Sequence, residues 1–472
     1  MTRDHLKADI CVIGAGSAGL SFAAGASQLG KNVVLIEKGE MGGDCLNYGC
    51  VPSKALLAAG AAAQYARTAD KFGVRASVEV DFAEAMAQVQ RTIDTIAPVD
   101  SQERFEGLGV TVLRHEAKFT GPREVVAGDT TVTAKFFIVA TGSVPAVPPI
   151  DGLDSIHFDT NETIFSHKVA PKHLLVIGGG PIGIEMAQAH RRLGADVTLV
   201  EADQILPRED REAADVVKEA LLKEGVKILE GVYAEKVEND GEGLIKATLS
   251  DKSVIVGDRL LVAVGRRVDV SSLNLEAAGV DVENGRPKVD KTLKTTNPRV
   301  YLAGDVAGGK QFTHVAGDDA SRLVRTILFK MPSPKRDELA PHVTYCDPEI
   351  ASVGLTEDEA KAAYGTIKTA RWSFDENDRA QAEGRTEGFL KAITKPNGKI
   401  VGAVIVGKNA GDQILIWAAA MANGWKISSF TSMIAPYPTR SEITKRTAGA
   451  FYTPTLFSDR TRFLIKALSI FD

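Results

Sequence analysis

Short apolar runs that end in glycine turns organise the first 330 residues of the chain. A β-branched run ends at Gly14, a stretch of helix length follows, and a second apolar run closes at Glu37, so this order predicts a strand, a helix and a strand. The segments 136–142, 259–265 and 299–305 are further apolar strands that end in a glycine turn. Strands that alternate with helices in this way predict an α/β fold.

The strand, helix and strand unit occurs twice. DICVIGAGSAGLSFAAGASQLGKNVVLIEK is followed later by HLLVIGGGPIGIEMAQAHRRLGADVTLVEA, at an offset of 164 positions (178 − 14). The glycines of the two G-x-G-x-x-G motifs are Gly14, Gly16, Gly19, Gly178, Gly180 and Gly183. Such a loop makes a tight turn and lets a pyrophosphate reach the helix N-terminus, while the closing acids Glu37 and Glu201 can accept hydrogen bonds from a ribose. The repeat therefore predicts two bound dinucleotides.

Other segments separate these units. Asp81 to Phe105 has the spacing of one long amphipathic helix, and Val110 to Thr133 has that of short strands. Pro145, Pro148 and Pro149 mark a linker. Beyond Lys330, the connector MPSPKRDELAP leads into alternating strands and then helices from Asp412 onward, which predicts a further domain.

Composition narrows the function classes. A length of 472 residues predicts roughly three domains. The net charge of -5 and the absence of a Lys/Arg block in the sequence give no electrostatic footprint for nucleic acid. Four cysteines are too few for a secreted disulfide scaffold, so we expect a reducing, cytoplasmic location. No apolar stretch of the sequence approaches the length of a membrane span.

Cys45 and Cys50 follow the first unit, in GGDCLNYGCVPSK. Three interpretations compete: a metal site, for which neighbouring ligands are missing from the sequence; two buried thiols that only pack; and a redox disulfide, which we favour. On an ideal helix the two Cα atoms would lie about 8 to 9 Å apart, too far for a disulfide, so the helix must start distorted. Gly49 gives that freedom, and Lys54 should share a helix face with Cys50. Cys11 and Cys346 lie in strand-like runs and should be buried and inert.

These motifs resemble the flavoprotein disulfide reductases, the family of dihydrolipoamide dehydrogenase, glutathione reductase and mercuric reductase. The C-x4-C box, both nucleotide units, the Ala140-Thr141-Gly142 turn, the strand end at Asp305 and the segment VTYCDPEIASVGLTE appear in the family's order. The resemblance implies two Rossmann-like dinucleotide-binding domains and a C-terminal α+β dimerisation domain. The implied segments are 1–149 and 268–335 for FAD, 150–267 for NAD(P)H and 336–472 for the homodimer interface.

The resemblance also implies roles for individual residues. Cys50 faces the flavin as a charge-transfer thiolate, Cys45 exchanges with substrate, and Lys54 pairs with Glu185 beside the flavin; a solvated helix lysine is the alternative for Lys54. Asp305 binds the ribityl chain. The full set of cofactor-binding candidates is Gly14, Gly16, Ser17, Gly19, Glu37, Lys38, Gly43, Asp44, Lys54, Ala117, Thr141, Gly142, Gly178, Gly180, Ile182, Gly183, Glu201, Gly265, Arg266, Gly304, Asp305 and His314. His314 has a structural hydrogen-bonded histidine as its alternative.

Two positions depart from the family pattern. Tyr437, with Glu442 downstream, stands where disulfide-handling members carry the His of a His-Pro pair; a phenol donates a hydrogen bond but is a poor base near neutral pH. Asp44 replaces the more usual Thr. Its carboxylate either raises the pKa of Cys45 or caps the distorted helix, and the sequence leaves both alternatives open.

The functional prediction is an FAD-dependent NAD(P)H:disulfide oxidoreductase, with NADH preferred over NADPH because Glu201 repels a 2'-phosphate. Electrons would pass from NADH through FAD to the Cys45-Cys50 disulfide and on to a small acceptor, such as a dihydrolipoyl or lipoamide group run in either direction. The alternatives are reduction of a soft metal ion or a quinone, or a binding subunit with little turnover. No structural metal site is expected.

Overall fold

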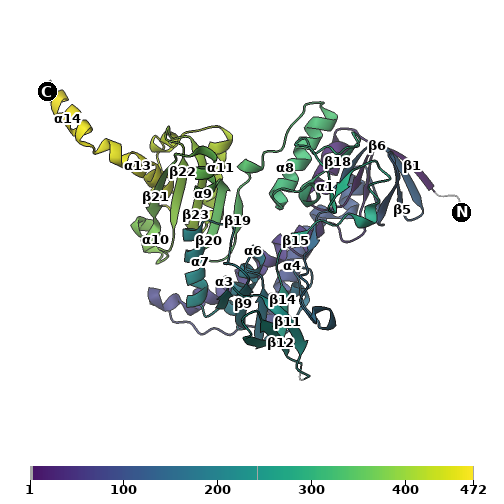
Figure 1. Ribbon diagram of the computed structural model, residues 1–472, viewed down its shortest axis with the longest axis horizontal. Helices are drawn as coiled ribbons and strands as arrows, with labels where there is room; N and C mark the ends of the chain where they lie inside the picture. Colours follow the sequence, from purple (N-terminus) through teal and green to yellow (C-terminus); the bar gives the residue numbers. More distant parts are fainter. Residues whose placement is uncertain (1–3, 242, 471–472) are drawn as a thin grey trace. The chain divides into compact units, whose positions relative to one another are not determined.

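The computed structural model describes residues 4–241 and 243–470. The chain divides into two compact units, one comprising Met1–Ala202 with Val226–Asp337 and the other Asp203–Gly225 with Glu338–Asp472. Figure 1 labels their helices and strands. Within the described residues, no helix is both long and apolar enough to cross a membrane. The α/β class expected from the sequence is confirmed.

The first sheet of unit 1 has the order β3-β2-β1-β6-β5-β4, and β18 also pairs with β6. Its strands are β1 (Asp4–Ile13), β2 (Val33–Ile36), β3 (Val110–Leu113), β4 (Ala117–Gly121), β5 (Glu124–Ala127), β6 (Thr130–Val139) and β18 (Val300–Leu302). In β1, Ile10 and Val12 enter one buried cluster while Cys11 and Ile13 enter the other. Both faces of this mostly parallel sheet are therefore covered, as its continuous apolar runs predict.

Two helices far apart in the chain cover one face of this sheet. α1 (Ser17–Gln28) contributes Leu20 and Phe22 to a cluster that also holds Ala316 and Ala320 of α8 (Thr313–Leu323). Figure 1 shows the two helices side by side next to β1 and β6. This packing brings the N-terminus of α8 to the end of the sheet where the first glycine loop lies.

The second sheet repeats this parallel arrangement in the order β10-β9-β8-β14. Its strands are β8 (His173–Ile177), β9 (Asp196–Glu201), β10 (Lys227–Glu230) and β14 (Arg259–Val262), with α6 (Pro181–Arg192) after β8. α6 begins and ends 164 positions after α1, so the repeat in sequence is a repeat in structure. The smaller antiparallel pairs and ribbon of unit 1 are β7 (Val144–Pro145) with β15 (Arg266–Arg267), β16 (Val282–Glu283) with β17 (Arg286–Pro287), and β11 (Ala234–Asn239), β12 (Ile245–Leu249) and β13 (Val254–Gly257).

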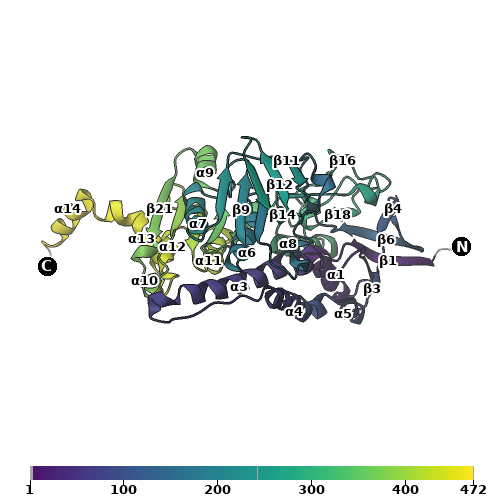
Figure 2. The same cartoon turned by 90° about the horizontal axis from the view of Figure 1, so that it is seen from below.

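Four helices lie between β2 and β3: α2 (Gly43–Asn47), α3 (Cys50–Arg67), α4 (Phe82–Asp100) and α5 (Gln102–Gly107). The single helix expected over 81–105 is wrong, because Ser101 adopts an extended conformation and its side chain caps α5 by accepting from the Arg104 amide. α3 packs against α4 and α6, and Figure 2 shows α3 running beside α4.

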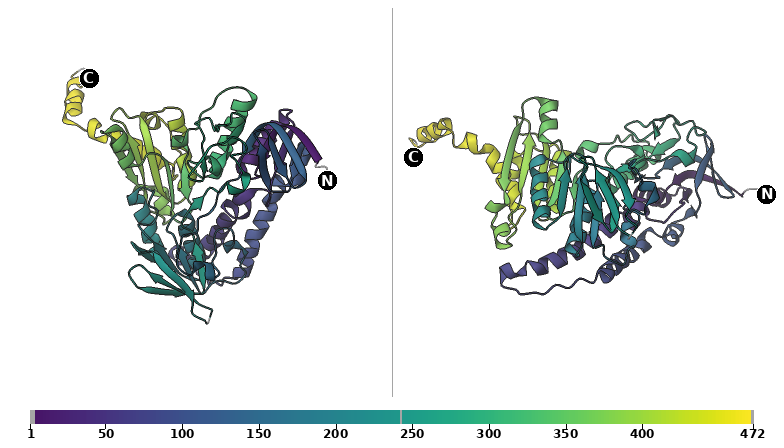
Figure 3. Two further views of the ribbon diagram at one scale, coloured as in Figure 1. Left: turned by 45° about the vertical axis from the view of Figure 1, so that its right-hand side comes forward. Right: turned by 60° about the horizontal axis from the view of Figure 1, so that its bottom comes forward.

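Unit 2 is built on an antiparallel sheet of order β19-β20-β23-β22-β21. Its strands are β19 (His342–Thr344), β20 (Glu349–Gly354), β21 (Lys368–Ser373), β22 (Phe389–Thr394) and β23 (Ile400–Gly407). The helices are α7 (Arg211–Lys223), α9 (Glu357–Tyr364), α10 (Asp378–Ala382), α11 (Ala410–Ala422), α12 (Ser428–Thr431), α13 (Glu442–Leu456) and α14 (Asp459–Leu468). Trp417 of α11 is fully buried against Phe430, and both side chains join the core on the sheet, whose strands are the yellow-green arrows in Figure 3.

Candidate functional site

The first glycine loop has the geometry of a phosphate cradle. Gly14 has φ +104°, and a Cβ there would collide with the carbonyl of Ala140, so only glycine fits this turn. Gly16 caps α1 without a side-chain hydrogen bond, and a Cβ there would meet only Gly43, 4.0 Å away. The amides at the start of α1 are thus approachable from outside the loop, which is what a pyrophosphate requires.

The second glycine loop repeats this arrangement. Gly178 has φ +111° and lies against the carbonyl of Ala263, whereas a Cβ at Gly180 would meet nothing within 4 Å. The closing acids are also equivalent: Glu37 Oε2 accepts from the Ala15 amide at 2.6 Å, and Glu201 Oε2 accepts from the Gly179 amide at 2.6 Å. Both carboxylates therefore lie beside their loops, and the residues present fit two dinucleotides.

The cysteine box lies directly against the first loop. The Gly42 amide donates to the Ala15 carbonyl at 3.0 Å, and a Cβ on Gly43, where φ is +60°, would lie 2.7 Å from the Gly16 Cα. Cys45 belongs to α2, while Cys50 is the first residue of α3. The break between these helices supplies the distortion that the cysteine spacing requires, and the close approach places the thiols next to the cradle.

The two thiols differ strongly in acidity. Their side chains hydrogen-bond to each other, and this bond is the main reason why the pKa of Cys50 falls to about 6 while that of Cys45 rises. Burial raises both values. Thr313 Oγ1, at 3.2 Å from Cys50 Sγ, and the charge of Lys54 lower the pKa of Cys50 further. At neutral pH this arrangement holds Cys50 as the thiolate and Cys45 as the thiol.

Lys54 and Glu185 form an ion pair. Lys54 Nζ lies 2.8 Å from Glu185 Oε2, and the Glu185 side chain is only 6% exposed. Because α3 packs on α6, the cysteine helix and the helix of the second nucleotide unit meet at this pair. Lys54 is therefore not a solvated helix lysine, which was the alternative for this residue. Its role beside the flavin stays a prediction.

Asp44 does not cap a helix. The N-caps of α2 and α3 are Gly42 and Gly49, and neither has a side-chain cap. Instead, Asp44 Oδ1 accepts from Arg266 Nη2 at 3.0 Å and from Asn161 Nδ2 at 2.9 Å. The capping alternative is therefore wrong, and the charge of Asp44 contributes a smaller rise to the pKa of Cys45 and of Cys50.

Arg266 links this carboxylate to a second one. Its Nε donates to Ser143 Oγ at 2.7 Å, and Ser143 Oγ in turn donates to Asp305 Oδ2 at 2.5 Å. The guanidinium, 14% exposed, thus lies between Asp44 of the cysteine box and Asp305. The network ties the box to the two strand ends at residues 143 and 305.

The remaining cofactor candidates lie around the two loops. Ser17 is in α1, Ile182 in α6, and Ala117 is buried at the start of β4. Lys38 pairs with Glu116 at 3.4 Å. Gly142, Gly265 and Gly304 have positive φ, and Thr141 follows β6. Gly19 and Gly183 lie in α1 and α6, where a Cβ would collide with the carbonyl oxygen of Gly14 or Gly178. His314 stacks on Phe312, with ring centroids 5.4 Å apart. Cys11 and Cys346 are fully buried, as expected.

Tyr437 and Glu442 belong to unit 2. Tyr437 is 68% exposed, and its hydroxyl donates to Asp378 Oδ2 at 2.8 Å, a bond that raises the pKa of the phenol. Glu442 pairs with Arg446, one turn along α13, at 2.8 Å. Tyr437 is therefore an exposed donor whose phenolate, the form that could act as a base, is even less populated at neutral pH than that of a free tyrosine.

Three residues of the cysteine network were missed from the sequence: Thr313, Asn161 and Ser143. Thr313 adjoins His314, which was singled out, but a threonine at a helix start carries no motif. Asn161 lies in an irregular loop, and Ser143 follows the Thr141-Gly142 turn. The signal that could have suggested Ser143 is its place at the end of an apolar strand.

Comparison with known proteins identifies the family. The family described as "Pyridine nucleotide-disulphide oxidoreductase" matches residues 8–320, and its dimerisation domain matches residues 340–448. Mercuric reductase of Lysinibacillus sphaericus is 34% identical over 94% of this chain and 82% of its own length. Dihydrolipoyl dehydrogenase of Thermus scotoductus is 37% identical over 92% of this chain and 95% of its own length.

A solved structure is similar throughout. The Cu(II) complex of the HOCl-induced flavoprotein disulfide reductase RclA from Escherichia coli superposes with a TM-score of 0.83 at 28% identity, and covers 93% of this chain and 98% of that one. The chain thus contains two glycine loops that fit a pyrophosphate, two cysteines of different pKa and a dimerisation domain. The protein belongs to the class I pyridine nucleotide-disulfide oxidoreductases, which are FAD-dependent enzymes that use NAD(P)H.

Proposed function

We propose that this protein passes electrons from NADH to the Cys45-Cys50 disulfide and on to a small acceptor. Bound FAD would supply hydride acceptance from the nicotinamide and two-electron transfer to the disulfide. In the reduced pair, Cys50 is the charge-transfer thiolate and Cys45 the exchanging thiol. Lys54, neutralised in part by Glu185, keeps positive charge beside Cys50.

The observation that carries this proposal is the placement of the cysteine pair. The box packs directly on a loop that fits a dinucleotide, and the Thr313 hydroxyl and the charge of Lys54 stabilise Cys50 as a thiolate there. A thiol pair that only packs needs no such surroundings. Conversely, a thiolate next to the cofactor and a partner thiol that can exchange are what dithiol chemistry needs.

Two classes of compound are candidates for the electron acceptor. With a disulfide such as lipoamide, Cys45 forms a mixed disulfide and releases one thiol; Cys50 then attacks Cys45, which re-forms the protein disulfide and releases the second thiol. With a soft metal ion such as Hg(II), both sulfurs would act as ligands, and NADH, by way of bound FAD, would supply the two electrons that reduce the ion. Tyr437 favours the second candidate, because a phenol bound to Asp378 is a poor proton carrier for thiol release. The names of the relatives include both activities.

A spectroscopic experiment tests the roles of the cysteines. Stoichiometric anaerobic reduction with NADH should give long-wavelength thiolate-to-flavin absorbance in the wild type and none in Cys50→Ser. Cys45→Ser should show this absorbance before reduction, because Cys50 then has no disulfide partner. Identical spectra in the wild type and Cys50→Ser would overturn the proposal, and also favour the low-turnover binding subunit.

The acceptor is tested by an anaerobic screen of lipoamide, glutathione disulfide, a quinone, Hg(II) and Cu(II). We expect slow lipoamide turnover by the wild type and faster turnover by Tyr437→His, since general acid-base assistance is worth about 100- to 10,000-fold. If the wild type turns over lipoamide fast and Tyr437→Phe does not change that rate, dihydrolipoamide dehydrogenase activity becomes the favoured function.

The nicotinamide preference rests on Glu201 at the end of β9. A carboxylate there accepts ribose hydroxyls and repels a 2'-phosphate, so the specificity constant should be higher for NADH than for NADPH. Arg208 and Arg211 lie downstream of Glu201 in the sequence and are the two residues that could rescue NADPH binding; Arg211 is engaged by Asp215 and the Ile205 carbonyl. We also infer that the protein is a homodimer whose subunits share their active sites, which mixed dimers can test. We further infer a cytoplasmic location, which fractionation of cells can test.

A further inference from the structure

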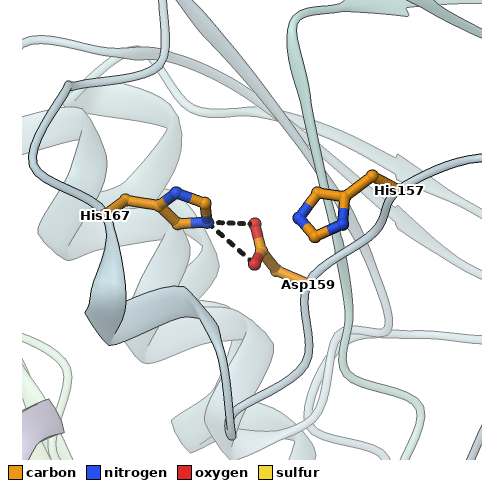
Figure 4. A group of neighbouring side chains, drawn as sticks. All are labelled: His157, Asp159 and His167. Carbon is orange, nitrogen blue, oxygen red and sulfur yellow. Dashed lines mark hydrogen bonds and ion pairs between the residues drawn. The ribbon is translucent and has the colours of Figure 1, made fainter.

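Three metal-ligating side chains converge away from the cysteines, in the loop before β8. His157, Asp159 and His167 each offer one ligand atom, and these atoms all lie within 4.8 Å of one another. Figure 4 shows the Asp159 carboxylate between the two imidazole rings, with ring nitrogens turned towards it from both sides. Neither nucleotide loop includes these residues.

The central ligand is rigidly held. Asp159 is fully buried, its amide donates to the Leu260 carbonyl at 2.8 Å, and its carbonyl accepts from the Val262 amide at 2.8 Å. Its carboxylate accepts from the Thr163 hydroxyl at 2.8 Å. Backbone bonds to β14 and a side-chain bond within the loop thus fix the carboxylate before any ion arrives, as a preorganised site requires.

The imidazoles complete the donor set. His167 Nε2 lies 2.8 and 2.9 Å from the two Asp159 oxygens, a separation that two ligands of one ion can adopt. His157 is exposed, so the third side of the cluster opens to solvent. Two imidazoles, one carboxylate and an open side are the ligand set of a three-coordinate protein site for a borderline divalent cation.

The charges around the cluster are compatible with a cation. Arg259 Nε lies 3.9 Å from Asp159 Oδ2, which is beyond hydrogen-bond range. Within the described part of the chain, Arg259 is the one arginine that the structure pairs with this carboxylate. The buried His190 lies within electrostatic range of Asp159 and His167, but burial lowers its pKa to about 4. At neutral pH it adds no positive charge that would repel an ion.

We propose that His157, Asp159 and His167 bind one divalent cation of the Zn²⁺ class. This inference does not depend on the proposed redox function, because no cysteine takes part. The Zn²⁺ ion would bind His167 Nε2 in place of a proton, which the neutral imidazole would then carry on Nδ1, and would take water on its open side. In the absence of Zn²⁺, the Asp159–His167 contact is an ordinary hydrogen bond.

The test is a Zn²⁺ titration of the oxidised FAD-loaded enzyme, followed by calorimetry and by elemental analysis after desalting. The same titration in the Cys45→Ser/Cys50→Ser background removes the other metal-binding thiols. We expect one Zn²⁺ per subunit in both proteins, and a rise in melting temperature with Zn²⁺. The exposed residue His157 gives the decisive variant, since His157→Ala leaves the buried pair intact.

We expect His157→Ala and His167→Ala to weaken Zn²⁺ binding at least tenfold, whereas His115→Ala, an exposed histidine on another loop, leaves it unchanged. Co²⁺ as a second probe should give a visible ligand-field band beyond the flavin absorption that disappears in His157→Ala. Absence of Zn²⁺ binding to the wild type, or equal affinity in His157→Ala, would overturn the proposal, whatever the outcome for the cysteines.

Discussion

At the scale of single residues, the acidity of Cys50 depends on neighbours from distant parts of the chain. Cys45 lies five positions away, but Thr313 is 263 positions away and Asp44 is held by Arg266, 222 positions away. These contacts set the pKa of a thiolate that lies beside a half-buried thiol. Small changes in the contacts therefore change the pKa values of the two cysteines.

Thr313→Val should raise the pKa of Cys50. The hydroxyl at 3.2 Å lowers that pKa, and a hydrogen bond to a charged group is worth about 1.5 to 3 kcal/mol, which corresponds to roughly one pKa unit or more. In the wild type, the thiolate forms as the pH rises through about 6, so the charge-transfer absorbance of the reduced enzyme should rise there and be lost below. Thr313→Val should move this titration upward. Thr313→Ser keeps the hydroxyl and should titrate like the wild type; an unshifted Thr313→Val would contradict the assignment.

Asp44→Asn should make the thiols more acidic. The Asp44 carboxylate raises the pKa of both cysteines through its charge, but this contribution is smaller than that of the Thr313 hydroxyl, so the effect should be smaller than that of Thr313→Val. Because Cys50 is already a thiolate at neutral pH, the effect should appear below it: the charge-transfer absorbance of reduced Asp44→Asn should be lost at a lower pH than that of the wild type. Asp44→Glu, which restores the charge, serves as the control. Equal titration midpoints in wild type and Asp44→Asn would show that Arg266 fully neutralises the carboxylate.

At the scale of elements, the close approach of α2 to the start of α1 couples the cysteine box to the nucleotide loop. Gly43 faces Gly16 with no room for a Cβ, and Gly42 is hydrogen-bonded to Ala15. The position of both cysteines relative to the cradle thus depends on one contact between two backbones.

Gly43→Ala should impair FAD binding. An added Cβ at 2.7 Å from Gly16 must push the loop or α2 away. Gly73→Ala is a matched control, because Gly73 has a similarly positive φ of +77° but open space around it. Both variants should lose about 1 to 2 kcal/mol from the strained backbone, but only Gly43→Ala should release flavin, as measured by the absorbance that passes a desalting column. Full retention of FAD by Gly43→Ala would show that the loop can move without loss.

At the scale of the whole molecule, the family's dimerisation domain raises the question of which subunit supplies Tyr437. Mixed dimers answer it. In the first combination, Cys45→Ser subunits are co-assembled with Tyr437→Phe subunits. If Tyr437 acts across the dimer, one site in each heterodimer then combines an intact Cys45 with an intact Tyr437 from the other subunit. Dimers of wild type with the Cys45→Ser/Tyr437→Phe double variant should then have none.

The measurement is lipoamide-dependent NADH oxidation by heterodimers purified through two different affinity tags. Activity only in the first combination is expected. Activity only in the second would mean that Tyr437 serves its own subunit, and equal activity in both would mean that Tyr437 has no part in turnover.

Much of the fold could be predicted from the sequence because its signals are local. The spacing of Gly14, Gly16 and Gly19 fixes a turn and a helix start, and the second copy does the same. The break of the helix over 81–105 was missed, since Ser101 ends α4 by a cap that a periodic pattern conceals. The His157-x-Asp159 pair and His167 were passed over as well, because loop residues have no periodicity to bring them together.

The sequence by itself determined the two nucleotide units, the order of the elements around them and the candidate redox pair, because each depends on residues within a few positions of one another. The tertiary structure alone decided which neighbours make Cys50 the more acidic thiol and what Asp44 does. Those outcomes depend on Thr313 at the start of α8, Arg266 in β15 and Asn161 in an irregular loop, which all lie far from the box in sequence. A pKa reflects the charges and hydrogen bonds within a few ångströms in space, and no local pattern specifies them.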